Sequence, residues 1–175
     1  MFWIIDNSKE VLDKLHICNT NKNSHAKHFD SYDFATLYTN IPHGTLKTNL
    51  RELINEAYKV RGAKYIVIHR QGKAYWSVTP SSAVSCKNVD KNTLIEWLEY
   101  LINVYINVGN KVYRQTIGIP MGTDCAPQLA NLFLFSYEFS YMRNLIKNNL
   151  YMAQRFNYTF RYIDDLLIIA CLKKS

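Results

Sequence analysis

The stretch FRYIDDLLII, residues 160–169, places two adjacent carboxylates, Asp164 and Asp165, inside an apolar run. Before the acids, aromatic side chains alternate with polar ones from Phe156 to Tyr162. This period of two is typical of a half-buried strand, and the apolar residues resume directly after the acids. The pattern therefore predicts a β-hairpin that carries the two carboxylates at its tip.

Two adjacent carboxylates repel each other, and burying them is costly unless a partner neutralises their charge. A divalent cation is such a partner, because it prefers hard oxygen ligands. A third carboxylate, Asp33, lies far upstream in another strand-like run, residues 29–37. Three carboxylates on two strands are consistent with a two-metal site for phosphoryl transfer.

The carboxylate pair also has a plainer interpretation. An Asp-Asp pair is most often a solvated turn. In a chain with 13 tyrosines, a Tyr-x-Asp-Asp match arises by chance often enough to be only moderate evidence. The alternation before Tyr162 is what favours a hairpin that projects the acids into a cleft.

Composition suits one domain with a polyanionic partner. The chain has 175 residues, 48% of them apolar, and a net charge of +7, which favours a polyanionic partner. Within residues 139–175 the only acids are Asp164 and Asp165, among six basic residues, although a basic surface can also serve solubility. The four cysteines lack zinc-site spacing, and the sequence predicts neither a signal peptide nor a membrane span.

Periodicity and turn residues predict an α+β order of elements. Helices are expected over residues 8–16, 42–62, 94–108 and 124–148. Strands are expected over residues 29–39, 65–69, 74–78 and 111–117 and in the hairpin around the acids, with loops over residues 79–90 and 118–122. The expected architecture is a small antiparallel sheet that carries the three acids, with helices packed on one face.

Three segments resemble, in order, three palm motifs of reverse transcriptases. The first is FDSYDFATLYTNIPH, residues 29–43, the second is QTIGIPMGTDCAPQLANLF, residues 115–133, and the third is RYIDD, residues 161–165. The sequences of the first two motifs are most similar to those of Penelope-like retroelements, which are related to telomerase reverse transcriptase. The resemblance implies a right-hand polymerase palm with partial fingers.

The resemblance implies catalytic roles for the acids. Asp33 and Asp164 would ligate two Mg²⁺ ions, with Mn²⁺ as a possible substitute, Asp165 would assist, and the Phe34 backbone carbonyl would complete a ligand shell. One ion would lower the pKa of the primer 3′-hydroxyl, and the other would hold the triphosphate and stabilise the leaving pyrophosphate.

The resemblance also implies nucleotide and nucleic-acid contacts. Tyr38 would be the aromatic gate that excludes a 2′-hydroxyl, although it could instead be a core aromatic. In the Gly/Pro loop, Pro120, Met121 and Gly122 would contact the nucleotide and its template base. Tyr162 would support the primer terminus, and Arg161 would reach a phosphate.

The implied function is RNA-directed DNA polymerisation, with an RNA template, a DNA primer and deoxynucleotides as partners and an intracellular, nuclear location. Because only ten residues follow Asp165, we expect residues 1–175 to be a truncated reverse transcriptase domain without a thumb. Two alternatives stay open: an inactive remnant that only binds nucleic acid, and a metal-dependent phosphohydrolase that uses the same carboxylates.

Overall fold

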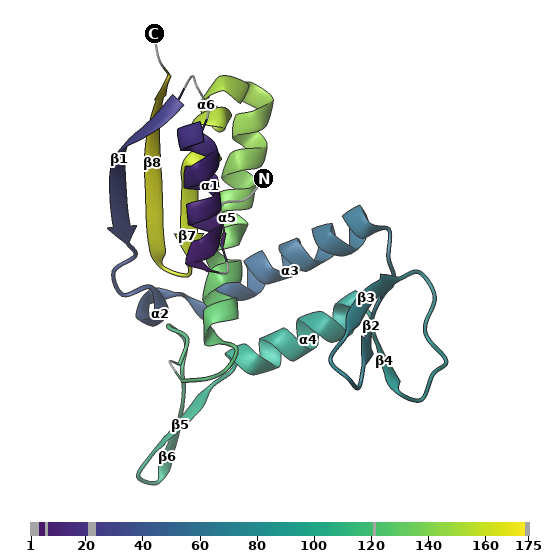
Figure 1. The fold of residues 1–175 in the computed structure, drawn as a ribbon. Helices are drawn as coiled ribbons and strands as arrows, with labels where there is room; N and C mark the ends of the chain where they lie inside the picture. The colour runs from purple at the N-terminus through teal and green to yellow at the C-terminus, as the bar shows by residue number, and fades with distance from the viewer. Residues whose placement is uncertain (1–3, 6, 21–23, 121, 174–175) are drawn as a thin grey trace. The chain divides into compact units, whose positions relative to one another are not determined.

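The computed structural model describes residues 4–5, 7–20, 24–120 and 122–173. It divides the chain into two compact units. The first consists of Met1–Leu37 and Asp124–Ser175, and the second is Tyr38–Thr123. The fold is mixed α/β with antiparallel sheets, as the sequence predicted (Figure 1).

The first unit contains a three-stranded antiparallel sheet in the order β1-β8-β7. Its strands are β1 (Ser24–Asp33), β7 (Thr159–Tyr162) and β8 (Asp165–Lys173). The predicted hairpin is confirmed for its closed end, where β7 pairs with β8 and Tyr162 lies opposite Asp165. Residues 156–158, whose alternation predicted a strand, are helical instead, so β7 begins only at Thr159. Strand β1 ends at Asp33, six residues before the predicted end, and the chain then enters the short helix α2 (Leu37–Asn40).

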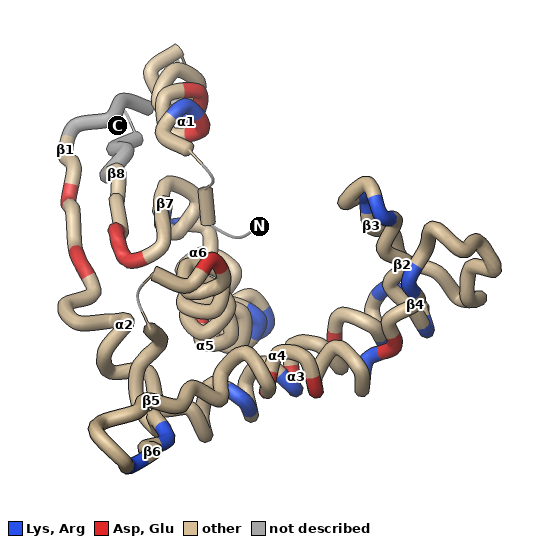
Figure 2. Tube along the Cα trace, turned by 90° about the horizontal axis from the view of Figure 1, so that it is seen from below, with Lys and Arg blue, Asp and Glu red and all other residues tan. Residues whose placement is uncertain are grey.

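Helices cover both faces of this sheet, whereas the sequence predicted helices on one face. Figure 2 shows α1 (Ser8–Thr20) and α5 (Ala126–Asn148) on opposite sides of the strands. The physical reason lies in β7, where Thr159, Phe160 and Arg161 are all buried although successive side chains point to opposite faces. After α5, the short helices α6 (Leu150–Gln154) and η1 (Arg155–Tyr158) return the chain to β7.

The second unit pairs two helices with two small sheets. Helix α3 (His43–Arg61) ends at Gly62 in the left-handed conformation, as predicted, and packs against α4 (Lys91–Ile102). One sheet has the order β3-β2-β4, from β2 (Tyr65–His69), β3 (Ala74–Ser77) and β4 (Cys86–Val89). The other is the hairpin of β5 (Tyr105–Val108) and β6 (Lys111–Arg114).

Two sequence predictions in this unit are wrong. Strand β4 lies in the segment predicted to be a loop, because pairing with β2 buries Val67 and Val89 completely. The helix predicted over residues 94–108 ends at Ile102, and its last part forms β5, whose β-branched and aromatic residues favour a strand.

Asp90 caps the N-terminus of α4 by accepting hydrogen bonds from the Asn92 and Thr93 amides. These hydrogen bonds, that from the Thr93 amide first, lower the pKa of the Asp90 carboxyl.

The core of the second unit is built on the buried face of α3, which packs against α4 and whose C-terminal end meets the β2–β4 sheet at Tyr58. Its buried side chains on α3 are Leu46, Leu50, Ile54 and Tyr58. The Tyr58 hydroxyl donates a 2.8 Å hydrogen bond to the Val89 carbonyl, and burial followed by the nearby Asp90 charge raises the Tyr58 pKa. No helix in the described ranges has an apolar stretch sufficient to cross a bilayer.

Candidate functional site

The fold brings two of the three predicted carboxylates directly opposite each other. Asp33 is the last residue of β1, Asp165 is the first of β8, and the two are cross-strand partners. Partners of this kind have Cα atoms about 4.5–5.5 Å apart and project to the same face of the sheet. Both side chains are exposed, and like charges placed opposite each other destabilise a sheet, so a cation at this end of the sheet would relieve the repulsion.

Asp164 lies beside this pair in the two-residue turn that joins β7 to β8. Its backbone carbonyl accepts a 3.2 Å hydrogen bond from the Phe34 amide, which ties the turn to the end of β1. The preceding residue, Ile163, has a φ of 54°, a conformation that disfavours β-branched side chains. Thr36, three residues after Asp33, has a φ of 60°. Backbone strain of this kind concentrates at functional sites, and here it lies in the turn before Asp164 and in the segment after Asp33.

Arg161 is buried completely, with no exposed surface. Its Nε and Nη2 atoms donate to the two carboxylate oxygens of Glu138 on α5, and its Nη1 donates to Asn131 Oδ1 at 2.6 Å and to the Ile163 carbonyl at 2.7 Å. These four bonds fix the guanidinium between α5 and the turn. This corrects the expectation that Arg161 reaches a phosphate, because its donors face inward and are occupied.

Tyr162 and Phe34 remain accessible on either side of the carboxylates. The Tyr162 side chain is 48% exposed and lines, with Asp165, Phe160 and residues at the start of α1, a hollow of about 460 Å³. Phe34 is 40% exposed, and its carbonyl accepts a hydrogen bond from the Leu37 amide at 3.2 Å. A carbonyl oxygen has a second lone pair, so this bond leaves capacity for the predicted metal contact.

The donor set suits a hard divalent cation, since carboxylate and carbonyl oxygens are the ligands such ions prefer. In the described part of the chain, no three His, Cys, Asp or Glu side chains are grouped closely enough to hold a metal ion. Strand pairing therefore determines where Asp33, Asp164 and Asp165 lie along the backbone. Their side chains do not converge on one point as the ligands of a preformed metal site would.

The predicted nucleotide-binding residues lie in the second unit, apart from Met121, which is outside the described residues. The Tyr38 carbonyl accepts a 2.6 Å hydrogen bond from the Ile119 amide, so the residue predicted as the sugar gate is bonded to the Gly/Pro loop. Pro120 is half-buried, and Gly122 is exposed with a φ of 99°. A Cβ on Gly118 would lie 3.0 Å from the Tyr38 carbonyl oxygen, which explains the glycine at that position.

His43 holds the Gly/Pro loop, and no motif in the sequence singled it out. It is buried, and its Nε2 lies 2.6 Å from the Gly118 carbonyl oxygen, 75 positions along the chain. Because a carbonyl only accepts, Nε2 carries the proton. The His43 amide also donates to the Thr116 carbonyl. His43 therefore holds the loop after β6 against the start of α3.

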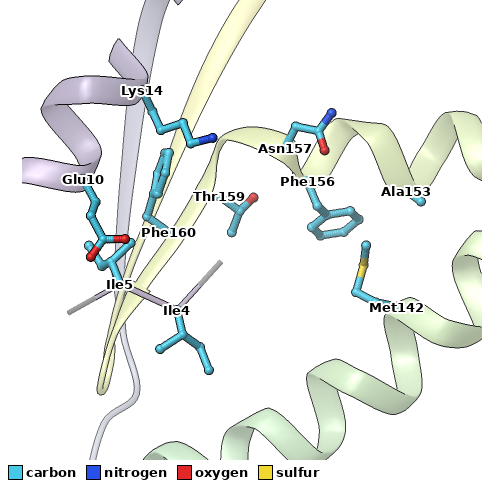
Figure 3. A pocket seen from close by; sticks show the side chains of 10 residues that line it. All are labelled: Ile4, Ile5, Glu10, Lys14, Met142, Ala153, Phe156, Asn157, Thr159 and Phe160. Atoms are coloured by element: carbon cyan, nitrogen blue, oxygen red, sulfur yellow. The ribbon is translucent and has the colours of Figure 1, made fainter. Parts of the chain in front are cut away.

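A cavity of about 260 Å³ in the first unit contains none of the predicted site residues. Figure 3 shows Glu10 and Lys14 of α1 on one side of it and Met142 and Ala153 on the other. Its lining is mainly apolar, so it reads as incomplete packing between helices rather than as a site for phosphate chemistry.

No protein-family model and no curated protein matches the chain, whereas solved structures share its fold. The structural likeness is to telomerase. Apo telomerase from Candida tropicalis superimposes with a TM-score of 0.65 at 16% identity, over 96% of this chain and 27% of that one. Telomerase from Candida albicans in complex with a TWJ fragment of telomeric RNA gives 0.61 at 13% identity, over 96% and 27%.

A further telomerase structure, from Candida tropicalis with the same kind of RNA fragment, gives a TM-score of 0.58 at 14% identity. The chain covers 25% of that protein and thus spans about a quarter of the length of the telomerases it matches. At these identities the likeness establishes the fold alone. The chain therefore has a fold similar to one part of telomerase.

Proposed function

We propose that the chain is the palm and part of the fingers of a reverse transcriptase, an RNA-directed DNA polymerase that acts in the nucleus. The observation that carries this proposal is the register that sets Asp33 opposite Asp165 and bonds the Asp164 turn to Phe34. The three motif resemblances, of which the first two are of the Penelope-like type, and the telomerase fold support the same function. The TWJ fragment of telomeric RNA bound to a telomerase of this fold supports RNA as a partner.

In this proposal Asp33, Asp164 and Asp165 hold two Mg²⁺ ions, with help from the Phe34 carbonyl. When bound, the ions would activate the primer 3′-hydroxyl and stabilise the leaving pyrophosphate. Tyr162, exposed beside Asp165, supports the primer terminus. Pro120, Met121 and Gly122 contact the incoming nucleotide, and Tyr38, bonded to the same loop, checks its sugar.

The test is primer extension on an RNA template with Mg²⁺ and deoxynucleotides, by a protein that contains residues 1–175. Extension that depends on RNA, primer and Mg²⁺ would support the proposal. Binding of template–primer without extension would instead favour a nucleic-acid-binding remnant. Release of phosphate from a nucleotide without extension would favour a phosphohydrolase.

Tyr38→Ala should admit ribonucleotides in the same assay. An aromatic ring below the sugar excludes a 2′-hydroxyl by steric overlap, and removing the ring removes this exclusion. We expect the preference for deoxynucleotides, measured as the ratio of kcat/KM values, to fall by at least about tenfold, which corresponds to about 1.4 kcal/mol. Tyr38→Phe, which keeps the ring, is the control and should retain the preference. An unchanged ratio in Tyr38→Ala would show that Tyr38 is a core aromatic.

A further inference from the structure

The positive charge of the chain is concentrated in one part of the second unit. Residues 59–92 contain a single acid, Asp90, and seven basic residues: Lys59, Arg61, Lys64, Arg70, Lys73, Lys87 and Lys91. The rest of the chain is nearly neutral, since its net charge is +7. Figure 2 shows Lys and Arg positions, in blue, near β2, β3 and β4 and the ends of α3 and α4 that adjoin them.

All seven basic side chains are exposed, and none forms an ion pair with a carboxylate within the described residues. Lys87 lies over the Trp97 ring at 4.2 Å, so its charge is partly engaged by α4. Asp90, the one acid, is directed at its own helix, since it accepts 2.9 Å hydrogen bonds from the Asn92 and Thr93 amides. The positive charge of this region is therefore not neutralised within the unit.

Three of the lysines converge on one hollow. Lys59, Lys64 and Lys91 line a depression of about 560 Å³ together with Asn55, Asn92 and Tyr65. Arg70 and Lys73 lie at the opposite end of β2, in and beside the turn that leads to β3. A five-residue strand and its flanking residues extend for about 20 Å at about 3.3 Å per residue, long enough to follow several phosphates of one strand.

We propose that this surface, which we call the β2–β4 basic surface, binds the sugar–phosphate backbone of a nucleic acid strand. Lysine is depleted from the cores of protein–protein interfaces, which are built around aromatic and aliphatic anchors. The hollow has three lysines against one acid, Asp90, and no aliphatic side chain larger than alanine. Of its two tyrosines, Tyr58 is buried and hydrogen-bonded to the Val89 carbonyl, which leaves Tyr65 as the accessible aromatic residue. Exposed lysines that neutralise phosphates are typical of nucleic-acid contact without sequence specificity.

This surface extends the proposed function. The assignment of a nucleic acid as its partner rests on that function. The sequence predicted phosphate contacts in the basic segment of residues 139–175 and from Arg161. Arg161 is buried, so it does not supply them. The β2–β4 basic surface belongs to the second unit, whereas the three carboxylates belong to the first, and the two can therefore be tested separately.

The test is the binding of a fluorescein-labelled 20-nucleotide single-stranded RNA to the full chain, followed by fluorescence anisotropy over a range of salt concentrations. Each phosphate contact contributes about 0.7 to the slope of log K against log salt for a single strand. The triple variant Lys59→Gln, Lys64→Gln, Lys91→Gln should therefore reduce the slope by about 2. DNA of the same sequence should behave alike, because phosphate contacts do not read the 2′-hydroxyl.

The matched control neutralises three lysines elsewhere, Lys9, Lys14 and Lys111, and should leave the slope within about 0.7 of wild type. Equal losses in both triple variants, or an unchanged slope in the first, would overturn the proposal. So would polyglutamate that competes as well as RNA at equal charge, because the surface would then be a general polyanion site. A Lys→Glu triple at positions 59, 64 and 91, checked for folding by circular dichroism, should abolish binding.

A final arm separates this proposal from the polymerase proposal. A variant with Asp33, Asp164 and Asp165 all changed to Asn should bind the RNA with the wild-type slope or a slightly weaker salt dependence. Loss of RNA binding in that variant would contradict the β2–β4 basic surface. Absence of primer extension by a protein that contains residues 1–175 and a thumb, and that binds RNA through this surface, would contradict the polymerase proposal alone.

Discussion

Asp164→Asn should abolish primer extension while leaving the protein folded. The substitution keeps the size of the side chain, but a neutral amide cannot balance the charge of the metal ions. The turn should persist, because the bond from the Phe34 amide is made to the Asp164 backbone carbonyl and the bond from Arg161 to that of Ile163. Primer extension at saturating Mg²⁺ measures the loss of activity, and circular dichroism of the same preparation measures whether the protein is folded.

Asp30→Asn is the matched control for this prediction. Asp30 lies on the same strand as Asp33, three residues earlier and therefore on the other face of the sheet. Its carboxylate contacts His28 at 2.9 Å and is outside the proposed site. Wild-type extension by Asp30→Asn and none by Asp164→Asn is the expected pair of results. Equal activity of both variants would refute the assignment of the carboxylates.

Glu138→Ala should lower the free energy of unfolding by about 3–5 kcal/mol, the range for removing one partner of a buried ion pair. The substitution leaves the completely buried Arg161 guanidinium without its counter-charge. Because Arg161 also holds the Ile163 carbonyl, the loss should reach the turn that carries Asp164. Urea unfolding monitored by circular dichroism gives the free energy, and hydrogen exchange of residues 161–165 reports on the turn.

Glu99→Ala supplies the comparison, because Glu99 pairs with Arg51 at the surface of the second unit. Exposed pairs contribute about 0–1 kcal/mol, so this variant should unfold almost as the wild type does. The double variant Arg161→Met, Glu138→Leu should recover part of the loss, since it leaves no unpaired charge. A loss below about 1 kcal/mol for Glu138→Ala would contradict the buried pair.

Local patterns explain which elements the sequence predicted well. The β7–β8 hairpin follows from an alternation confined to neighbouring residues, and α3 follows from apolar spacing closed by Gly62. Strand β4 has no such pattern in its own residues, since it exists through its pairing with β2. Elements whose stability comes from a distant partner are therefore the ones that local periodicity misses.

The site shows the same division between local and distant information. The motifs named Asp33, Asp164 and Asp165, but the pairing of Asp33 with Asp165 joins positions more than a hundred residues apart and depends on register. The burial of Arg161 went unpredicted because arginine is mostly exposed. A signal was present, because Glu138 lies seven residues after Asn131 and therefore on the same face of α5.

A crystal structure of the protein with Mn²⁺ and a deoxynucleotide tests the central claim most directly, since Mn²⁺ is located by its anomalous scattering. We predict anomalous peaks at the ends of β1 and β8, each ion within about 2.1 Å of carboxylate oxygens from Asp33 and Asp164. Asp33→Asn should remove them. Peaks elsewhere in the protein, or Asp33 and Asp164 carboxylates more than about 12 Å apart, would contradict a shared metal site on these two strands.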